Sequence, residues 1–117
     1  MQRSMKIGKA ADMPPGSSLR FIYRVDGIAH EGFAANVGGR YVAYENLCKH
    51  IPVPLDYDDN QFFTPDGKHF ICSTHGAVYN PLNGVCLAGP CAGARLNKIF
   101  AMEQNGDIWV KLPDGIE

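Results

Sequence analysis

Glycine and proline interrupt this chain so often that few stretches are long enough for a regular helix. The 117 residues include 13 glycines and 8 prolines, spread throughout the sequence. Several of the short stretches between them are rich in aromatic and β-branched side chains, which favour strands. The sequence therefore predicts an all-β fold, and its length suits one domain with a modest core.

Tight turns join the strands that we predict in the first half of the chain. Residues 19–25 end at Asp26-Gly27, a strong signal for a two-residue hairpin, and residues 28–37 form the return strand. Gly38-Gly39 gives a second tight turn before a third strand at residues 40–45. These three strands are expected to form an antiparallel meander.

A closing hairpin is predicted near the end of the chain. Its strands are residues 96–102 and 108–112, on either side of Asn105-Gly106. Trp109 in the last strand is expected to pack in the core.

The middle of the chain, residues 46–93, has a different character. Turns dominate it, and only residues 69–72 and 77–79 are predicted as short strands. We expect all 117 residues to form one domain, with a scaffold from residues 1–45 and 94–117 and this middle part as an insert. Such a turn-rich insert is not expected to stabilise itself through apolar burial. Something else should hold it, and a metal centre is one answer.

The insert contains two Cys/His pairs, which are Cys48 with His50 and Cys72 with His75. Each pair lies just after a predicted strand, where a loop can present side chains to a common point. A zinc finger usually takes two cysteines from one knuckle and two histidines from a helix, whereas here each loop supplies one of each. Two thiolates on one iron and two imidazoles on the other would complete a two-iron cluster. A mononuclear Cys₂His₂ zinc site is the competing interpretation.

The spacing Cys-X-His and then Cys-X-X-His resembles the signature of Rieske [2Fe–2S] proteins. The run from Gly76 to Tyr79 resembles the residues that follow the second histidine in that family. Asn83-Gly84 followed by Gly89-Pro90 resembles the family's proline loop, which shields the cluster. The resemblance spans roughly residues 19–112.

This resemblance implies a fold and a ligand set. The fold would be a Rieske-like antiparallel β sandwich or incomplete barrel, with a turn-rich cluster-binding subdomain inserted. One [2Fe–2S] cluster would be bound by Cys48, His50, Cys72 and His75. Around these ligands, the resemblance implies supporting roles for Gly76, Tyr79 and Pro90.

Three positions differ from the Rieske proteins of cytochrome bc complexes. Those proteins have an additional disulfide between the ligand loops, where this chain has Val53 and Thr74. They also have a serine that donates a hydrogen bond to a bridging sulfide, where this chain has Ala77. Because such hydrogen bonds stabilise the reduced cluster, we predict a low reduction potential of about −150 mV.

The function implied by the resemblance is electron transfer. A stand-alone Rieske ferredoxin would carry one electron from an NAD(P)H-dependent reductase to an oxygenase or another terminal oxidoreductase. No 2-His-1-carboxylate iron site is recognisable in the sequence, so the chain is not expected to be an enzyme. Two alternatives are a small subunit of a larger oxidoreductase, similar to that of nitrite reductase, and a redox- or iron-sensing module.

The charge and hydropathy of the chain limit the kinds of partner and the location that we expect for it. The net charge is −1 without any basic run, so nucleic acid is not an expected partner. No signal peptide or membrane-spanning stretch is recognisable, and a cytoplasmic location is expected. In a reducing compartment, Cys86 and Cys91 are expected to be two partly buried thiols, with a short disulfide between them as the alternative.

Overall fold

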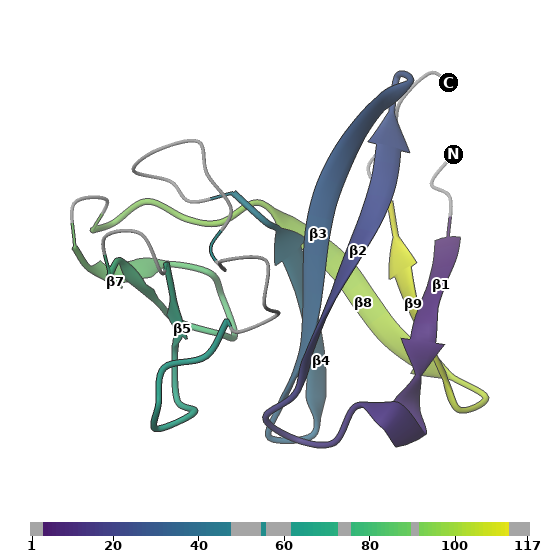
Figure 1. Cartoon of the computed structure of the whole chain (residues 1–117), viewed down its shortest axis with the longest axis horizontal. Coiled ribbons are helices and arrows are strands. Elements are labelled where there is room, and N and C mark those ends of the chain that lie inside the picture. Colours follow the sequence, from purple (N-terminus) through teal and green to yellow (C-terminus); the bar gives the residue numbers. More distant parts are fainter. Residues whose placement is uncertain (1–3, 48–54, 56–61, 73–75, 90–91, 113–117) are drawn as a thin grey trace.

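The computed structural model describes residues 4–47, 55, 62–72, 76–89 and 92–112, and these form two antiparallel sheets (Figure 1). The larger sheet has the strand order β1-β9-β8-β4-β3-β2, and the smaller has the order β5-β6-β7. The elements are β1 (Ser4–Lys9), the 3₁₀ helix η1 (Ala10–Asp12), β2 (Ser18–Val25), β3 (Ile28–Val37), β4 (Arg40–Glu45), β5 (Phe70–Ile71), β6 (Val78–Tyr79), β7 (Cys86–Ala88), β8 (Lys98–Gln104) and β9 (Asp107–Lys111). Within the described residues, no helix is long and apolar enough to cross a membrane.

The predicted hairpins are confirmed. Asp26 and Gly27 have φ values of 52° and 77°, and Asn105 and Gly106 have values of 55° and 80°. Two positive φ values are the mark of a type I′ turn, whose twist matches that of the flanking strands. As a result, β2 pairs with β3 along its whole length without a shift in register. The predicted bounds of β3 and β4 are correct, and β2 begins one residue earlier than predicted.

The remaining strands differ more from the prediction. β5 and β6 are shorter than predicted, β8 begins and ends two residues later, and β9 begins and ends one residue earlier. Two strands, β1 and β7, were not predicted from the sequence. β1 has only Met5 and Ile7 as alternating apolar residues, and β7 lies in a short stretch between two glycines, Gly84 and Gly89.

The larger sheet curls around the first of two apolar cores, which we call the barrel core. Its buried residues are Met13, Phe21, Tyr23, Ala34, Ala43, Ile99, Ile108, Val110 and Leu112. The two edge strands both contribute to it, because Met5 of β1 and Leu19 of β2 pack against the same residues. A Cβ atom on Gly8 of β1 would lie 3.2 Å from Cδ2 of Leu19. The edges of the sheet therefore approach one another, which confirms the predicted incomplete barrel.

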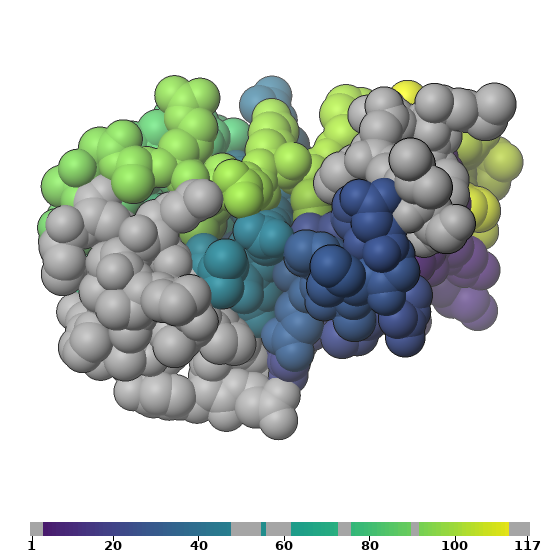
Figure 2. Space-filling view, turned by 90° about the horizontal axis from the view of Figure 1, so that it is seen from above, coloured from purple at the N-terminus to yellow at the C-terminus, as the bar shows by residue number. Residues whose placement is uncertain are grey.

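The second core, which we call the insert core, lies on the opposite face of β3 and β4. Its buried residues are Phe33, Ala35, Val42, Tyr44, Leu55, Phe62, Phe70, Cys72, Ala77, Tyr79, Cys86 and Leu96. Neighbouring residues of a strand point to opposite faces, so Phe33 belongs to the insert core and Ala34 to the barrel core. β3 and β4 are therefore a wall shared by both cores. Figure 2 shows the green surface of the insert and the blue surface of the β2–β3 hairpin on either side of the teal end of β4.

The insert is not expected to stabilise itself, and the structure shows that apolar contacts with the scaffold help to hold it. The ring of Phe62 stacks on that of Phe33 with 4.1 Å between centroids. The ring of Phe70 meets Phe33 edge-on at 5.1 Å and Tyr44 at 5.9 Å. These rings attach the insert to the wall and bury a large apolar area there.

The expectation for Trp109 is wrong. Ile108 and Val110 on either side of it are fully buried in the barrel core, so the alternation of the strand places Trp109 on the outer face. Its side chain is half-buried there.

Burial of two tyrosines predicts that the protein loses stability at alkaline pH. Burial raises the pKa of Tyr44 to about 12, and burial together with the charge of Glu45 raises the pKa of Tyr23 to about 12. An unfolded chain releases these protons near pH 10, so the free energy of unfolding should fall as the pH rises from about 10 to about 12. Thermal midpoints measured by circular dichroism against pH would show this fall. The Tyr44→Phe variant should show a smaller one, and a wild-type midpoint unchanged over this range would contradict the prediction.

Candidate metal centre

Cys72, one of the four predicted ligands, is buried at the end of β5. Its side chain has no exposed surface and belongs to the insert core. Two backbone hydrogen bonds join Cys72 to the next described residues, because the Cys72 N–H donates to the Ala77 carbonyl and the Gly76 N–H donates to the Cys72 carbonyl, both at 2.8 Å. His75 lies between these bonds in sequence, outside the described residues.

The chain after β7 rests directly on Ala77. A Cβ atom on Gly89 would lie 2.9 Å from Cα of Ala77, which is closer than real side chains come. Gly89 also has a φ of 101°, a conformation that favours glycine. The start of the predicted proline loop is thus packed against the base of the second ligand loop. Pro90 itself lies outside the described residues.

Cys86 is buried in the insert core but directs its thiol towards its own strand. Its Sγ donates to the carbonyl of Ala88 at 3.2 Å. Cys91 lies outside the described residues, so the choice between two thiols and a disulfide remains a prediction.

Tyr79, for which the resemblance implied a supporting role, is fully buried in the same core as Cys72. It pairs with Phe70 across β5 and β6, while Phe70 lies only two residues before Cys72. The turn after β6 is fixed to the scaffold, because the hydroxyl of Tyr44 donates to the carbonyl of Pro81 at 2.8 Å. A hydroxyl with a pKa near 12 stays protonated at neutral pH and remains a donor.

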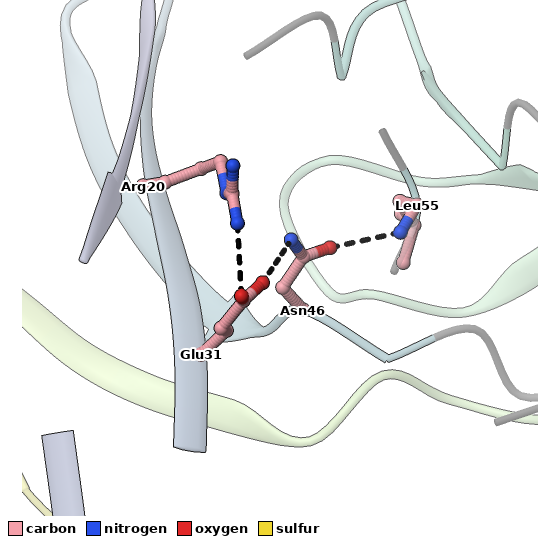
Figure 3. A network of polar contacts seen from close by, with 4 residues as sticks. All are labelled: Arg20, Glu31, Asn46 and Leu55. Carbon is pink, nitrogen blue, oxygen red and sulfur yellow. Dashed lines mark hydrogen bonds and ion pairs between the residues drawn. The ribbon is translucent and has the colours of Figure 1, made fainter. Parts of the chain in front are cut away.

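Polar contacts flank the stretch that contains the first Cys/His pair (Figure 3). Asn46 is 3% exposed, and its Oδ1 accepts a hydrogen bond from the N–H of Leu55 at 2.9 Å. Its Nδ2 donates to Oε2 of Glu31 at 3.4 Å, and Oε1 of Glu31 lies 2.9 Å from the guanidinium of Arg20. Cys48 and His50 lie between residues 46 and 55 in sequence, outside the described residues.

This network was not predicted from the sequence, although the pairing of two of its members, Arg20 and Glu31, follows from a sequence signal. The Asp26-Gly27 turn sets the register of β2 and β3, in which Ile22 is opposite Glu31. Arg20 is two residues before Ile22, so it lies on the same face as Glu31 and diagonal to it. No such signal marks Asn46, whose partners are distant in sequence.

A shallow pocket of about 250 Å³ adjoins this network. It is lined by His30, Glu31, Glu45, Asn46 and others, and Nδ1 of His30 lies 3.5 Å from Oε2 of Glu45. The carboxylates of Glu31 and Glu45 therefore line the same pocket as Asn46 and Leu47, and Leu47 directly precedes the predicted ligand Cys48 in sequence.

The described part of the site fits an iron–sulfur cluster. Cys72 offers a buried thiol, backbone hydrogen bonds join it to Gly76 and Ala77, and Gly89 packs directly against Ala77. Two thiols and two imidazoles are the donor set of a Rieske cluster. Among the described residues there is no group of three or more metal-ligating side chains, and three of the four predicted ligands lie outside them.

Comparison with protein families identifies this chain. The model of the Rieske [2Fe-2S] domain matches residues 3–105, so the chain belongs to the Rieske [2Fe–2S] family. The domain of this family carries one [2Fe–2S] cluster. Comparison with curated proteins gave no match.

Several solved structures share the fold. A chain of the complex of reduced oxygenase and oxidized ferredoxin in carbazole 1,9a-dioxygenase is 27% identical, with a TM-score of 0.78 and 100% of both chains covered. The ferredoxin of carbazole 1,9a-dioxygenase from Nocardioides aromaticivorans IC177 is 21% identical, with a TM-score of 0.70 over 92% of this chain and 95% of that chain. Sphingomonas yanoikuyae B1 ferredoxin is 22% identical, with a TM-score of 0.72 over 95% of this chain and 100% of that chain.

Proposed function

We propose that this chain is a Rieske ferredoxin that carries single electrons to a terminal oxygenase. The ligands of its one [2Fe–2S] cluster would be Cys48, His50, Cys72 and His75. The strongest support is the Rieske family match along nearly the whole chain, together with likeness to ferredoxins over 95% and 100% of their length. The chain is an electron carrier and not itself an enzyme.

The described residues suit this role. The cluster supplies a reversible one-electron change when it is bound. The burial of Cys72, Ala77 and Tyr79 in an apolar core keeps water away from the inner side of the site. Packing of Phe62 and Phe70 against the wall restricts movement of the chain around Cys72, so little rearrangement is needed when the charge changes.

The partners follow from the same role. One solved relative is described as a complex of oxygenase with ferredoxin, and we propose an oxygenase as the electron acceptor of this chain. An NAD(P)H-dependent reductase would be the donor. We place the protein in the cytoplasm, where a reducing environment keeps cysteine ligands available. Residues 46–93 would form the cluster-binding subdomain, and residues 1–45 and 94–117 the scaffold.

An electron paramagnetic resonance (EPR) spectrum, recorded before and after reduction with dithionite, tests this proposal. We expect a signal only after reduction, with the low average g value of a histidine-ligated two-iron cluster. An absence of signal in both states, together with zinc in elemental analysis, would replace electron transfer with a structural metal site. Stable co-purification with a large catalytic chain would instead favour a permanent subunit.

Ala77 gives a test of the predicted low potential. Protein-film voltammetry should give about −150 mV for the wild type. Ala77→Ser adds a hydroxyl at a fully buried position, and a new hydrogen bond to the cluster should raise the potential. A bond of about 1 kcal/mol corresponds to about 40 mV for one electron.

Ala35→Ser is the matched control for Ala77→Ser. Ala35 is also fully buried in the insert core, but it lies on β3. Its replacement should lower stability and leave the potential unchanged. Equal potentials for the wild type and the Ala77→Ser variant would contradict the role given to position 77.

A further inference from the structure

A single side chain connects the two ends of the stretch between β4 and Leu55. The backbone N–H of Asn46 donates to the carbonyl of Glu31 at 2.9 Å, which fixes the start of the stretch on β3. Its side-chain Oδ1 accepts from the N–H of Leu55 at 2.9 Å, which fixes the end. Leu55 has no exposed surface and belongs to the insert core. Asn46 thus joins residues nine positions apart at a buried point.

The orientation of the Asn46 amide is set by charge. Its Nδ2 faces Oε2 of Glu31 at 3.4 Å, and a carboxylate accepts hydrogen bonds but does not donate them. The amide nitrogen must therefore face Glu31, and the amide oxygen must face Leu55. Arg20, 2.9 Å from the other carboxylate oxygen, holds the Glu31 side chain in place. Figure 3 shows the four residues in this order, from β2 to Leu55.

We infer that Asn46 is a positioning residue for the first ligand loop, and that the Arg20–Glu31 ion pair orients it. This inference rests on the proposed function, because the stretch between Asn46 and Leu55 contains the predicted ligands Cys48 and His50. Asn46 lies only two residues before Cys48, so its anchoring limits where that ligand can be. Residues that orient ligands in this way commonly change metal affinity by about 10- to 100-fold.

Cluster loss from two asparagine variants tests the inference. Asn36 is a matched control, because it is 4% exposed, its Nδ2 donates to the carbonyl of Met13 at 2.8 Å, and its Oδ1 accepts from the N–H of Gly39 at 2.8 Å. It lies at the other end of the scaffold, beside the β3–β4 turn. Bleaching of the visible absorption with a chelator should be at least about tenfold faster for Asn46→Ala than for Asn36→Ala.

Spectroscopy separates positioning from a general loss of stability. Melting curves followed by far-UV circular dichroism are first used to choose a temperature at which both variants are folded. At that temperature, the EPR g values and the reduction potential should change for Asn46→Ala and remain those of the wild type for Asn36→Ala. Equal rates of cluster loss, or unchanged g values and potential for Asn46→Ala, would overturn the inference.

A pair of isosteric changes covers the case in which Asn46→Ala does not fold. Asn46→Asp keeps the acceptor for Leu55 but puts a second carboxylate beside Glu31, so the cluster should be lost faster than in the wild type. Adding Glu31→Gln places an amide donor opposite the new carboxylate at position 46. The rate of cluster loss should then fall at least severalfold, towards the wild-type rate. A double variant that loses the cluster as fast as Asn46→Asp alone would overturn the proposed orientation.

The wild-type EPR spectrum distinguishes failure of the proposed function from failure of the inference about Asn46 alone. Without a Rieske signal in the wild type, the proposed function fails and the inference fails with it. With a Rieske signal in the wild type and equal behaviour of the Asn46 and Asn36 variants, only the inference fails.

Discussion

Replacing Cys72 with serine should produce a folded protein without a Rieske EPR signal. Cys72 is the predicted ligand that the structure places, buried in the insert core at the end of β5. Its replacement would remove one of the two proposed thiolate ligands, and a serine hydroxyl, which stays protonated at neutral pH, is a far poorer iron ligand than a thiolate. EPR after dithionite reduction and the iron content of the purified variant measure the effect.

Cys86→Ser is the control for this substitution. Cys86 is 2% exposed in the same core, and a serine hydroxyl can keep its hydrogen bond to Ala88. This variant should keep the cluster and the wild-type g values. If Cys72→Ser retains the signal, or Cys86→Ser loses it, the assignment of ligands is wrong.

Phe33→Ala should be the most destabilising change in the wall between the two cores. Phe33 has no exposed surface, and its ring contacts those of Phe62, Phe70 and Tyr44. Removing a buried phenylalanine costs about 3–5 kcal/mol, which lowers the thermal midpoint of a domain of this size by more than about 10 °C. Because the insert is attached through these rings, the variant should also lose its cluster faster. Circular dichroism melts and chelator-induced bleaching measure the two effects.

Phe100→Ala provides the comparison for Phe33→Ala. Phe100 is 53% exposed on β8, so truncation removes little buried area. Its effect on unfolding should stay within about 0.5 kcal/mol. A similar midpoint for the two variants would mean that the wall does not hold the insert.

The scaffold could be predicted from sequence because its geometry is set locally. Asp26-Gly27 and Asn105-Gly106 determine their hairpins through two positive φ values each, and the register of the flanking strands follows from the turn. The bounds of β3 were correct for this reason, and those of β4 because Gly38-Gly39 forms the turn between β3 and β4. β1 has no such turn beside it and was not predicted.

The packing of the insert could not be predicted because it depends on long-range contacts. Phe62 lies outside every predicted strand, and Phe70 lies in a predicted strand too short to show which partner it packs against. Their shared partner Phe33 is far away in sequence. The same reason applies to Asn46, whose role depends on residues from three separate segments.

The candidate site was predicted from motif spacing alone. Of its four ligands, the structure describes Cys72, and it places Gly76 and Tyr79 beside it in the chain and in the fold. Cys48, His50, His75 and Pro90 lie outside the described residues, so their roles remain predictions. A sequence motif identifies metal ligands well, because iron chemistry restricts the donor atoms. It does not indicate how the ligand loops pack against the rest of the fold.

The wall of β3 and β4 has a consequence for protein engineering. Phe33, Val42 and Tyr44 belong to the scaffold in sequence, yet their side chains complete the core of the insert. A graft of residues 46–93 onto a foreign sheet would deprive Phe62 and Phe70 of their ring contacts with Phe33. A portable cluster-binding module would have to include the outward face of these two strands, and it is therefore larger than the inserted segment.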